Sequence, residues 1–319
     1  MRHAETVVFG GSNLNRAADL RDEPEQLAQL QRDGQAIVLW RGKPFFDHES
    51  NVLVRFSSDH TILKQAVSDP VFLGLEGDTG LFAYDISPWQ APDADPRAMA
   101  RFFDTSFNQF PGTPPPQVFT ELRSVMARLS PRDAELAATA RGLFEWHRTH
   151  GFCARCGAKS SPQQAGWQRQ CPSCNALHFP RTDPVVIVLA THGNSVLMGR
   201  SHGWPEGMFS LLAGFMEPGE TMEAAARREV FEESAIRLGA VTYLSSQPWA
   251  FPASLMIGCS AEALNTDITI DPKEIEDARW FTREEVLQAT VSENPDLRPA
   301  RKGSIAHFLI HNWLSDTLT

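Results

Sequence analysis

Two closely spaced pairs of cysteines constrain the fold of this chain more than any other feature of its sequence. Cys153 and Cys156 form one Cys-x2-Cys pair, Cys171 and Cys174 form the other, and 14 residues separate the two pairs. Each pair forms a turn that directs two thiolates toward one ion, so the spacing predicts a tetrahedral structural zinc ribbon. A rubredoxin-like iron site uses the same ligands and is the alternative. Disulfides are the weaker interpretation, because we expect the chain to be cytoplasmic.

The four cysteines predict a structural zinc ion and not a catalytic one. Four thiolates complete the coordination shell of the ion and leave no open position for a substrate. His147 and His150 precede the first pair, and we expect them to be surface histidines at a helix end. The fifth cysteine, Cys259, lies in an apolar segment and is expected to be a small buried side chain.

Composition and charge exclude several classes of protein. The chain has 319 residues, of which 42% are hydrophobic and 21% charged, as in soluble globular proteins of two or more domains. A net charge of -10 argues against broad nonspecific binding to nucleic acid, but not against a nucleotide or one RNA end in a metal-lined cleft. The longest apolar run, at 184–190, is far shorter than the roughly 20 residues that cross a membrane. We therefore expect no membrane partner and a cytoplasmic location.

Residues 1–125 are expected to form one domain of short strands. Turn residues separate four segments with strand character, namely QAIVLW, NVLVRF, VFLGLEG and GLFAYDIS. We expect a helix at 95–110 and a proline-rich connector at 111–116. Because no catalytic spacing is evident here, we expect a structural or dimerising domain, with a share in substrate binding as the alternative.

The second half of the chain alternates strands with helices. Leu136, Ala140, Leu143 and Phe144 recur at helical spacing, which predicts an amphipathic helix within 131–152 that leads into the cysteines. From residue 183 the alternation predicts an α/β layered domain. Its expected strands lie in a hairpin at 184–201 and at 209–215, 241–246, 254–264 and 277–281, and its expected helices at 221–236, 282–290 and 303–318.

Three glutamates share one face of the expected helix at 221–236. Glu229, Glu232 and Glu233 stand at i, i+3 and i+4, and Arg228 is placed to pair with one of them. Exposed like charges at this spacing cost only about 0.2 to 0.5 kcal/mol per pair, so a solvated face is one interpretation. If they are partly buried, two of them about 4 Å apart repel by about 4 kcal/mol at an effective dielectric constant of about 20. The triad then requires a cation, and oxygen ligands select Mg²⁺ or Mn²⁺.

The segment 214–236 resembles the Nudix box, G-x5-E-x7-R-E-U-x-E-E-x-G-U, in which U is a bulky aliphatic residue. The matching positions are Gly214, Glu220, Arg228, Glu229, Val230, Glu232, Glu233 and Ile236. Ala235 stands where the box has its last glycine. The resemblance implies a hydrolase of nucleoside diphosphates linked to another group, with the box supplying the metal ligands.

The segment SQPWAFPASLM at 246–256 is expected to determine substrate specificity. Two prolines make it a poor central strand, so we expect a stiff loop that presents flat rings. It resembles the SQPWPFPxS signature of the NADH pyrophosphatases, with Ala250 in place of the middle proline. We expect the rings of Trp249 and Phe251 to face a base of the dinucleotide, against the alternative of an aromatic core loop.

Zinc ribbon, box and signature stand in the order of the NADH pyrophosphatase family, which the chain resembles well over about 140–319. The resemblance implies an α/β (α+β) fold, in which a Nudix α/β/α sandwich with a mixed sheet follows a zinc ribbon and a β-rich N-terminal domain. It also implies a homodimer. The expected domains are an N-terminal NADH-pyrophosphatase-like domain (1–125), a connecting helix (126–150), the zinc ribbon (151–181) and the Nudix hydrolase domain (182–319).

The resemblance implies metal-dependent hydrolysis of NAD(H) to nicotinamide mononucleotide and AMP, and removal of NAD caps from RNA 5′ ends. The rival substrates are diadenosine polyphosphates and ADP-ribose, and the rival class is a non-enzymatic nucleotide sensor. Glu229, Glu232 and Glu233 are the implied catalytic residues, and the general base stays open between Glu232 and Glu233.

The resemblance also implies further site residues. Glu274 and the backbone carbonyl of Ala213 would join the box glutamates around Mg²⁺ or Mn²⁺. The implied substrate-binding residues are Phe179, Phe215, Gln247, Pro248, Trp249, Ala250, Phe251, Pro252, Ala253, Ser254 and, through its backbone, Ala306.

Overall fold

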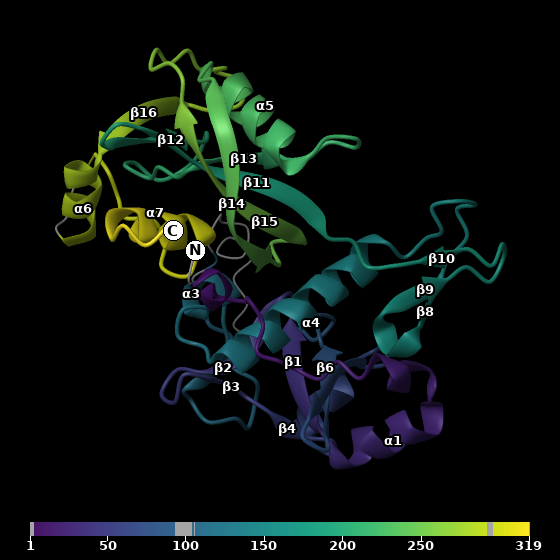
Figure 1. Cartoon of the computed structure of the whole chain (residues 1–319). Helices are drawn as coiled ribbons and strands as arrows, with labels where there is room; N and C mark the ends of the chain where they lie inside the picture. The colour runs from purple at the N-terminus through teal and green to yellow at the C-terminus, as the bar shows by residue number, and fades with distance from the viewer. Residues whose placement is uncertain (1–2, 93–103, 105, 292–295, 319) are drawn as a thin grey trace. The chain divides into compact units, whose positions relative to one another are not determined.

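The computed structural model describes residues 3–92, 104, 106–291 and 296–318 (Figure 1). The chain divides into two compact units. The N-terminal unit consists of Gly11–Arg181 and Ala250–Ala253, and the C-terminal unit consists of Met1–Gly10, Thr182–Trp249 and Ser254–Thr319. Four residues of the signature segment therefore belong with the N-terminal unit. The four-domain division stays a prediction.

The N-terminal unit is built on a seven-stranded sheet whose central strands run in the order β3-β2-β1-β6-β5. Its strands are β1 (Gln35–Trp40), β2 (Lys43–Asp47), β3 (Val52–Leu53), β4 (Phe56–Ser57), β5 (Val71–Glu76), β6 (Thr79–Asp85) and β7 (Gln117–Phe119). Strands β1 and β6 are parallel, whereas the other recorded pairs are antiparallel. The four predicted strand segments are confirmed, and β2 and β7 were not predicted. The helix expected at 95–110 lies mostly outside the described residues.

Aromatic side chains fill the core of this sheet. The rings of Trp40, Phe45 and Phe119 are buried and pack with centroids 4.8 to 5.9 Å apart. In the part of the unit that the structure describes, the α-helices are α1 (Pro24–Asp33), α3 (Leu122–Val125) and α4 (Pro131–Thr149). Helix α4 confirms the predicted helix, which begins at Pro131 after the Ser130 cap. It is not simply amphipathic, because its residues 133–138 are all buried and Phe144 is only partly buried.

The ribbon lies within the N-terminal unit as a small three-stranded sheet. Its strands are β8 (Ser161–Gln163), β9 (Gln168–Gln170) and β10 (Leu177–His178), in the order β10-β9-β8. Both neighbouring pairs are antiparallel.

The C-terminal unit is built on a six-stranded mixed sheet in the order β14-β15-β11-β12-β16, with β13 paired to β11. Its strands are β11 (Asp183–His192), β12 (Ser195–Arg200), β13 (Leu212–Phe215), β14 (Leu238–Trp249), β15 (Ser254–Ala263) and β16 (Asp277–Thr282). Strands β11 and β15 are parallel, and the remaining pairs are antiparallel. The helices are α5 (Met222–Ser234), α6 (Arg283–Val291) and α7 (Ile305–Leu314).

Helices cover both faces of this sheet. Successive side chains of β11 point to opposite faces, and apolar residues occupy both sets of positions. Val186, Val188 and Ala190 pack on the side of α5, in one core with its Ala226 and Val230. Ile187 and Leu189 point the other way, into a core with residues of α6 and α7. Figure 1 shows α5 on one side of these strands and α6 and α7 on the other. The predicted α/β/α sandwich is confirmed.

The structure corrects one local prediction. Ser246 to Trp249 are the last residues of strand β14, paired with β15 through Pro248 opposite Leu255 and Trp249 opposite Ser254. Because β14 is the edge strand of its sheet, it tolerates a proline that has no N–H to donate. Only residues 250–253 form the loop, as the tip of the β14–β15 hairpin. Among the described residues, no helix is long and apolar enough to cross a membrane.

Candidate metal centres and substrate loop

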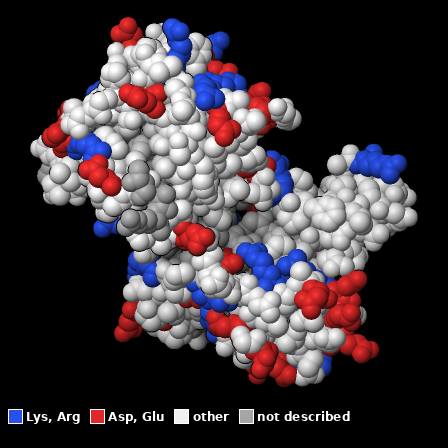
Figure 2. Space-filling model, viewed as in Figure 1, with Lys and Arg blue, Asp and Glu red and all other residues white. Residues whose placement is uncertain are grey.

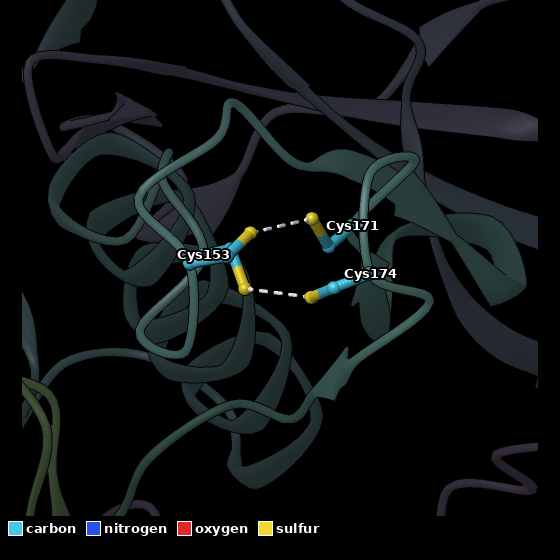
Figure 3. A group of neighbouring side chains, drawn as sticks. Cys153, Cys171 and Cys174 are labelled. Carbon is cyan, nitrogen blue, oxygen red and sulfur yellow. Dashed lines mark hydrogen bonds between the residues drawn. The ribbon is translucent and has the colours of Figure 1, made fainter.

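The four cysteines of the two pairs meet in one cluster. Their sulfur atoms all lie within 4.8 Å of one another. Sγ of Cys153 is 3.6 Å from that of Cys174, and Sγ of Cys156 is 3.5 Å from that of Cys171. Four sulfurs about 2.3 Å from a tetrahedral zinc ion are about 3.8 Å apart, so the cluster fits zinc. Figure 3 shows the two pairs facing each other across the gap.

Backbone geometry builds each of the two turns in the same way. Gly157 donates its N–H to the Cys153 carbonyl, and Asn175 donates to the Cys171 carbonyl, each over 2.9 Å. Both donors have a positive φ, which closes the turn behind the ligands. Backbone N–H groups, that of Cys174 first, lower the pKa of Cys171 to about 7. The turn thus favours the thiolate form of Cys171, whereas the neighbouring sulfurs raise the pKa of Cys174 to about 12.

His147 is not a surface histidine, contrary to expectation. It is partly buried, with Nε2 2.8 Å from the Gly166 carbonyl and Nδ1 2.9 Å from a guanidinium nitrogen of Arg169. The carbonyl can only accept, so Nε2 carries the proton and the ring is neutral. The histidine holds the ribbon to helix α4 and does not compete with the cysteines.

Helix α5 carries the box glutamates and begins where the sequence predicts. The Thr221 hydroxyl accepts a hydrogen bond from the Ala224 N–H, which caps the helix. The three glutamates differ in environment, although they share one face. The Glu229 side chain is 13% exposed and that of Glu232 48% exposed, so the solvated-face interpretation fails for Glu229.

Arg228 organises these acids. Its guanidinium group donates to both carboxylate oxygens of Glu220, at 2.6 and 3.1 Å, and to Glu229 and Glu232, each at 2.9 Å. A fifth bond, also 2.9 Å, reaches the Phe215 carbonyl. Arg228 thus joins three of the box glutamates in one network, and Glu220, to which the sequence assigned no role, fixes the arginine from the loop before α5.

Glu233 has the most perturbed carboxyl group of the site. Desolvation, followed by the charges of Glu229, Glu274 and Glu232, raises its pKa to about 8. Its Oε2 is buried and has no hydrogen-bond partner in the described part of the chain. Desolvation also raises the pKa of Glu229, and Glu274 contributes there too. A buried, unpartnered carboxylate oxygen among other carboxylates fits an oxygen-ligated divalent cation.

Strand β13 brings the box glycine against these ligands. A Cβ atom added at Gly214 would overlap the carboxyl group of Glu229. Glycine at this position therefore permits the close approach of backbone and ligand, and a larger residue would displace the Glu229 carboxyl group. Ala213 and Phe215 flank it, Ala213 partly buried and Phe215 61% exposed. Their predicted roles, as a carbonyl ligand and a stacking ring, suit these positions and stay predictions.

Ala235 occupies the C-cap of α5, where it adopts a left-handed conformation with φ of 58°. Glycine adopts this conformation without strain, whereas alanine does not. The departure from the box therefore affects the helix end and leaves the ligands on α5 in place.

Gln247 holds the hairpin to other parts of the C-terminal unit. Its amide nitrogen donates to the carbonyls of Val8 and Gly303, both at 2.8 Å, and its oxygen accepts from the Ile305 N–H at 2.7 Å. The side chain is 1% exposed, so its polar groups are directed to the protein. The predicted role of Gln247 in substrate binding stays a prediction. These hydrogen bonds do not favour it, because they occupy the side-chain amide group.

The other predicted substrate residues occupy varied environments. Pro248 and Pro252 are exposed, and Trp249, Phe251, Ala253 and Ser254 are partly buried. Ala250 is buried, and its carbonyl accepts a bond from Arg141. Phe179, which follows β10, is 66% exposed.

Ala306 lies in the first turn of helix α7. Ser304 caps this helix by accepting from the His307 N–H, and Gln247 accepts from the Ile305 N–H. Over the described residues no partner is recorded for the Ala306 N–H between them. A backbone N–H at a helix start suits an anionic group, in line with the predicted backbone contact.

Three family models match the chain one after another. An NADH pyrophosphatase-like rudimentary NUDIX domain matches 33–146, an NADH pyrophosphatase zinc ribbon domain matches 148–179, and a NUDIX domain matches 180–307. Together they span both units and both candidate metal centres.

Curated proteins with similar sequences carry related names. The chain is 34% identical to the NAD-capped RNA hydrolase NudC of Mycobacterium bovis, over 89% of this chain and 90% of that protein. It is 41% identical to the human NAD-capped RNA hydrolase NUDT12, over 75% of this chain and 52% of that protein. The human mitochondrial NAD(P)H pyrophosphatase NUDT13 is 38% identical over 61% of this chain and 59% of that protein. The chain thus spans about half the length of the human relatives.

Proposed function

The chain belongs to the Nudix hydrolase family, in the group whose Nudix domain follows an NADH pyrophosphatase-like domain and a zinc ribbon, and we propose that it hydrolyses the diphosphate bond of NAD(H). The products are nicotinamide mononucleotide and AMP. The observation that carries the proposal is the cluster of carboxylates around Glu233 of α5, in a chain that also carries the SQPWAFPAS hairpin formed by β14 and β15. The first provides for diphosphate chemistry and the second for recognition of the dinucleotide.

Glu229, Glu232, Glu233 and Glu274 would hold Mg²⁺ or Mn²⁺, with the Ala213 carbonyl as a further ligand. The cation, when bound, neutralises the diphosphate and lowers the pKa of the attacking water. Glu232 or Glu233 accepts the proton of that water, since both lie at the site and a carboxylate serves either as ligand or as base. The hydroxyl adds to one phosphorus, the bridging P–O bond breaks, and the second phosphate leaves.

Arg228 has a positioning role in this scheme. It binds Glu220, Glu229 and Glu232 at once and thereby fixes the rotamers of two ligands before the cation arrives. The zinc cluster, with four sulfur ligands, supports the fold of the ribbon and takes no part in the reaction.

Removal of NAD caps from RNA is the second candidate function, supported by the names of the Mycobacterium bovis and human relatives. An NAD cap is NAD with a long 3′ extension, so the same bond would be cleaved. On the face drawn in Figure 2, basic and acidic side chains are interspersed, which suits recognition of one RNA end better than binding along a strand.

A substrate panel tests the proposal. NADH, ADP-ribose and a diadenosine polyphosphate are incubated with the full chain, with and without Mn²⁺, and kcat/KM is compared. We expect metal-dependent cleavage with NADH preferred. Trp249→Ala should lower kcat/KM for NADH about tenfold or more, because base stacking contributes about 1 to 3 kcal/mol, and should affect ADP-ribose much less. Equal losses on both substrates together with a large fall in Tm would show that the hairpin is only structural.

A further inference from the structure

The tip of the β14–β15 hairpin is held by one arginine from helix α4. Arg141 Nε donates to the Ala250 carbonyl over 2.6 Å, and Nη1 donates to the Gly42 carbonyl over 2.7 Å. Both carbonyls, the arginine and the tip belong to the N-terminal unit. The arginine thus joins the first residue of the tip to the turn between β1 and β2.

The same guanidinium group packs on an aromatic ring of the tip. Its carbon Cζ lies 4.8 Å from the centroid of the Phe251 ring, and Cζ of Arg123 lies 5.0 Å from the same centroid. Each guanidinium group is thus within reach of a cation–π contact with the ring. Phe251 is therefore anchored by the protein, two residues after Trp249, whose ring we propose to face the substrate.

The surroundings of Arg141 are adapted to this contact. A Cβ atom at Gly42 would overlap its guanidinium group, so glycine at this turn leaves the space that the arginine fills. Desolvation lowers the pKa of Arg141, and its side chain makes no ion pair among the described residues. The buried guanidinium group donates to the backbone carbonyls of Ala250 and Gly42, and these bonds fix the backbone at both positions.

We propose that Arg141 is a positioning residue for substrate recognition, which fixes the tip Ala250–Ala253 and so places Trp249 for the dinucleotide. The expected effect on NADH cleavage rests on the proposed function, whereas the contacts of Arg141 with the tip do not. It also gives the rudimentary domain a role, because Gly42 and Arg141 both lie in the span 33–146 that the family model matches. Within the N-terminal unit Arg141 holds the tip Ala250–Ala253, and the ligands on α5 make no part of this contact.

The contact is tested by substitutions that disturb the arginine in two independent ways. Arg141→Lys keeps the charge and loses the planar fork that reaches both carbonyls. Gly42→Ala leaves the arginine in the sequence and removes its space. Gly42 has φ of 76°, so its matched control is Gly77→Ala, which has φ of 60° and open space around the added Cβ. Arg148→Lys, on the same helix with an exposed side chain, is the matched control for Arg141→Lys.

Two readouts are measured, namely kcat/KM with NADH and with ADP-ribose, and hydrogen exchange of peptides that cover 247–256. We expect Arg141→Lys and Gly42→Ala to lower kcat/KM for NADH about tenfold, mainly through KM, and to change ADP-ribose less than about threefold. Amide exchange at the tip should accelerate in both variants, and both controls should resemble the wild type.

Unchanged exchange at the tip together with NADH kinetics within about twofold of the wild type would overturn the proposal. Equal losses on both substrates would also overturn it, since a purely structural role predicts them. If the wild type itself does not cleave NADH, the proposed function fails, and faster exchange at the tip would still support the positioning role while unchanged exchange would refute it.

Discussion

Glu233 provides the most direct link between the geometry of the site and a stability measurement. Burial and the neighbouring carboxylates raise its pKa from the ordinary 4.5 to about 8 when no cation is bound. The folded chain therefore binds this proton more tightly than the unfolded chain. The resulting stability is fully present below pH 4.5 and is lost as the pH rises to about 8. A pKa difference of this size corresponds to a loss on the order of 5 kcal/mol.

Glu233→Gln replaces the buried charge with a neutral group of the same shape. Without added Mg²⁺ or Mn²⁺, we expect the variant and the wild type to have similar Tm values near pH 5. Near pH 9 the variant should be the more stable, by roughly 10 °C for a unit of this size. Added Mn²⁺ should raise the Tm of the wild type at pH 9 and leave that of the variant almost unchanged, and the variant should lose most activity.

Scanning calorimetry from pH 5 to pH 9, with zinc retained, makes this comparison. Glu232→Gln is the matched control, because its side chain is 48% exposed and bonded to Arg228, so its Tm should show little extra dependence on pH. A Glu233→Gln variant that is no more stable than the wild type at pH 9, with or without Mn²⁺, would refute the buried-charge account of the site.

Three further substitutions test separate parts of the structure. Gly214→Ala should lower metal-dependent kcat at least tenfold, because the added Cβ displaces the Glu229 carboxylate. Gly239→Ala, whose added Cβ makes only ordinary contacts, should leave kcat unchanged. Equal kcat values for the two variants would contradict the close approach of Gly214 and Glu229. Ala235→Gly should raise the free energy of unfolding by about 1 kcal/mol with activity unchanged, because glycine adopts the left-handed C-cap conformation without strain. A variant that is less stable than the wild type in a denaturant titration would disprove this. Cys153→Ser should lose zinc and stability together, as measured by elemental analysis and Tm, whereas iron or no metal in the wild type would reject the zinc assignment.

Spacing and periodicity predicted the features that depend on local sequence. The Cys-x2-Cys pairs meet as predicted because each turn is closed by its own backbone. Glu229 and Glu233 share a face because an α-helix places them one turn apart. The layers of the C-terminal unit follow from the alternation of residues along β11, which divides its side chains between two cores.

Features that depend on distant partners were not predictable from the sequence. Residues 246–249 have the composition of a loop, and their pairing with β15 and position at the sheet edge make them a strand. The first ten residues carry no motif, yet Ser245 and Gln247 bond to the carbonyls of Ala4 and Val8. Arg141 was likewise one of several arginines in a helix, and only the fold brings Ala250 to it.

The identity of the products formed from NADH tests the central claim most directly. The full chain is incubated with NADH and Mn²⁺ in ¹⁸O-labelled water, beside Glu233→Gln, and the products are separated and weighed by mass spectrometry. The account predicts equal amounts of reduced nicotinamide mononucleotide and AMP, with one labelled oxygen on one of the two phosphates, and little product from the variant. Intact NADH, or release of nicotinamide with the diphosphate preserved, would contradict it.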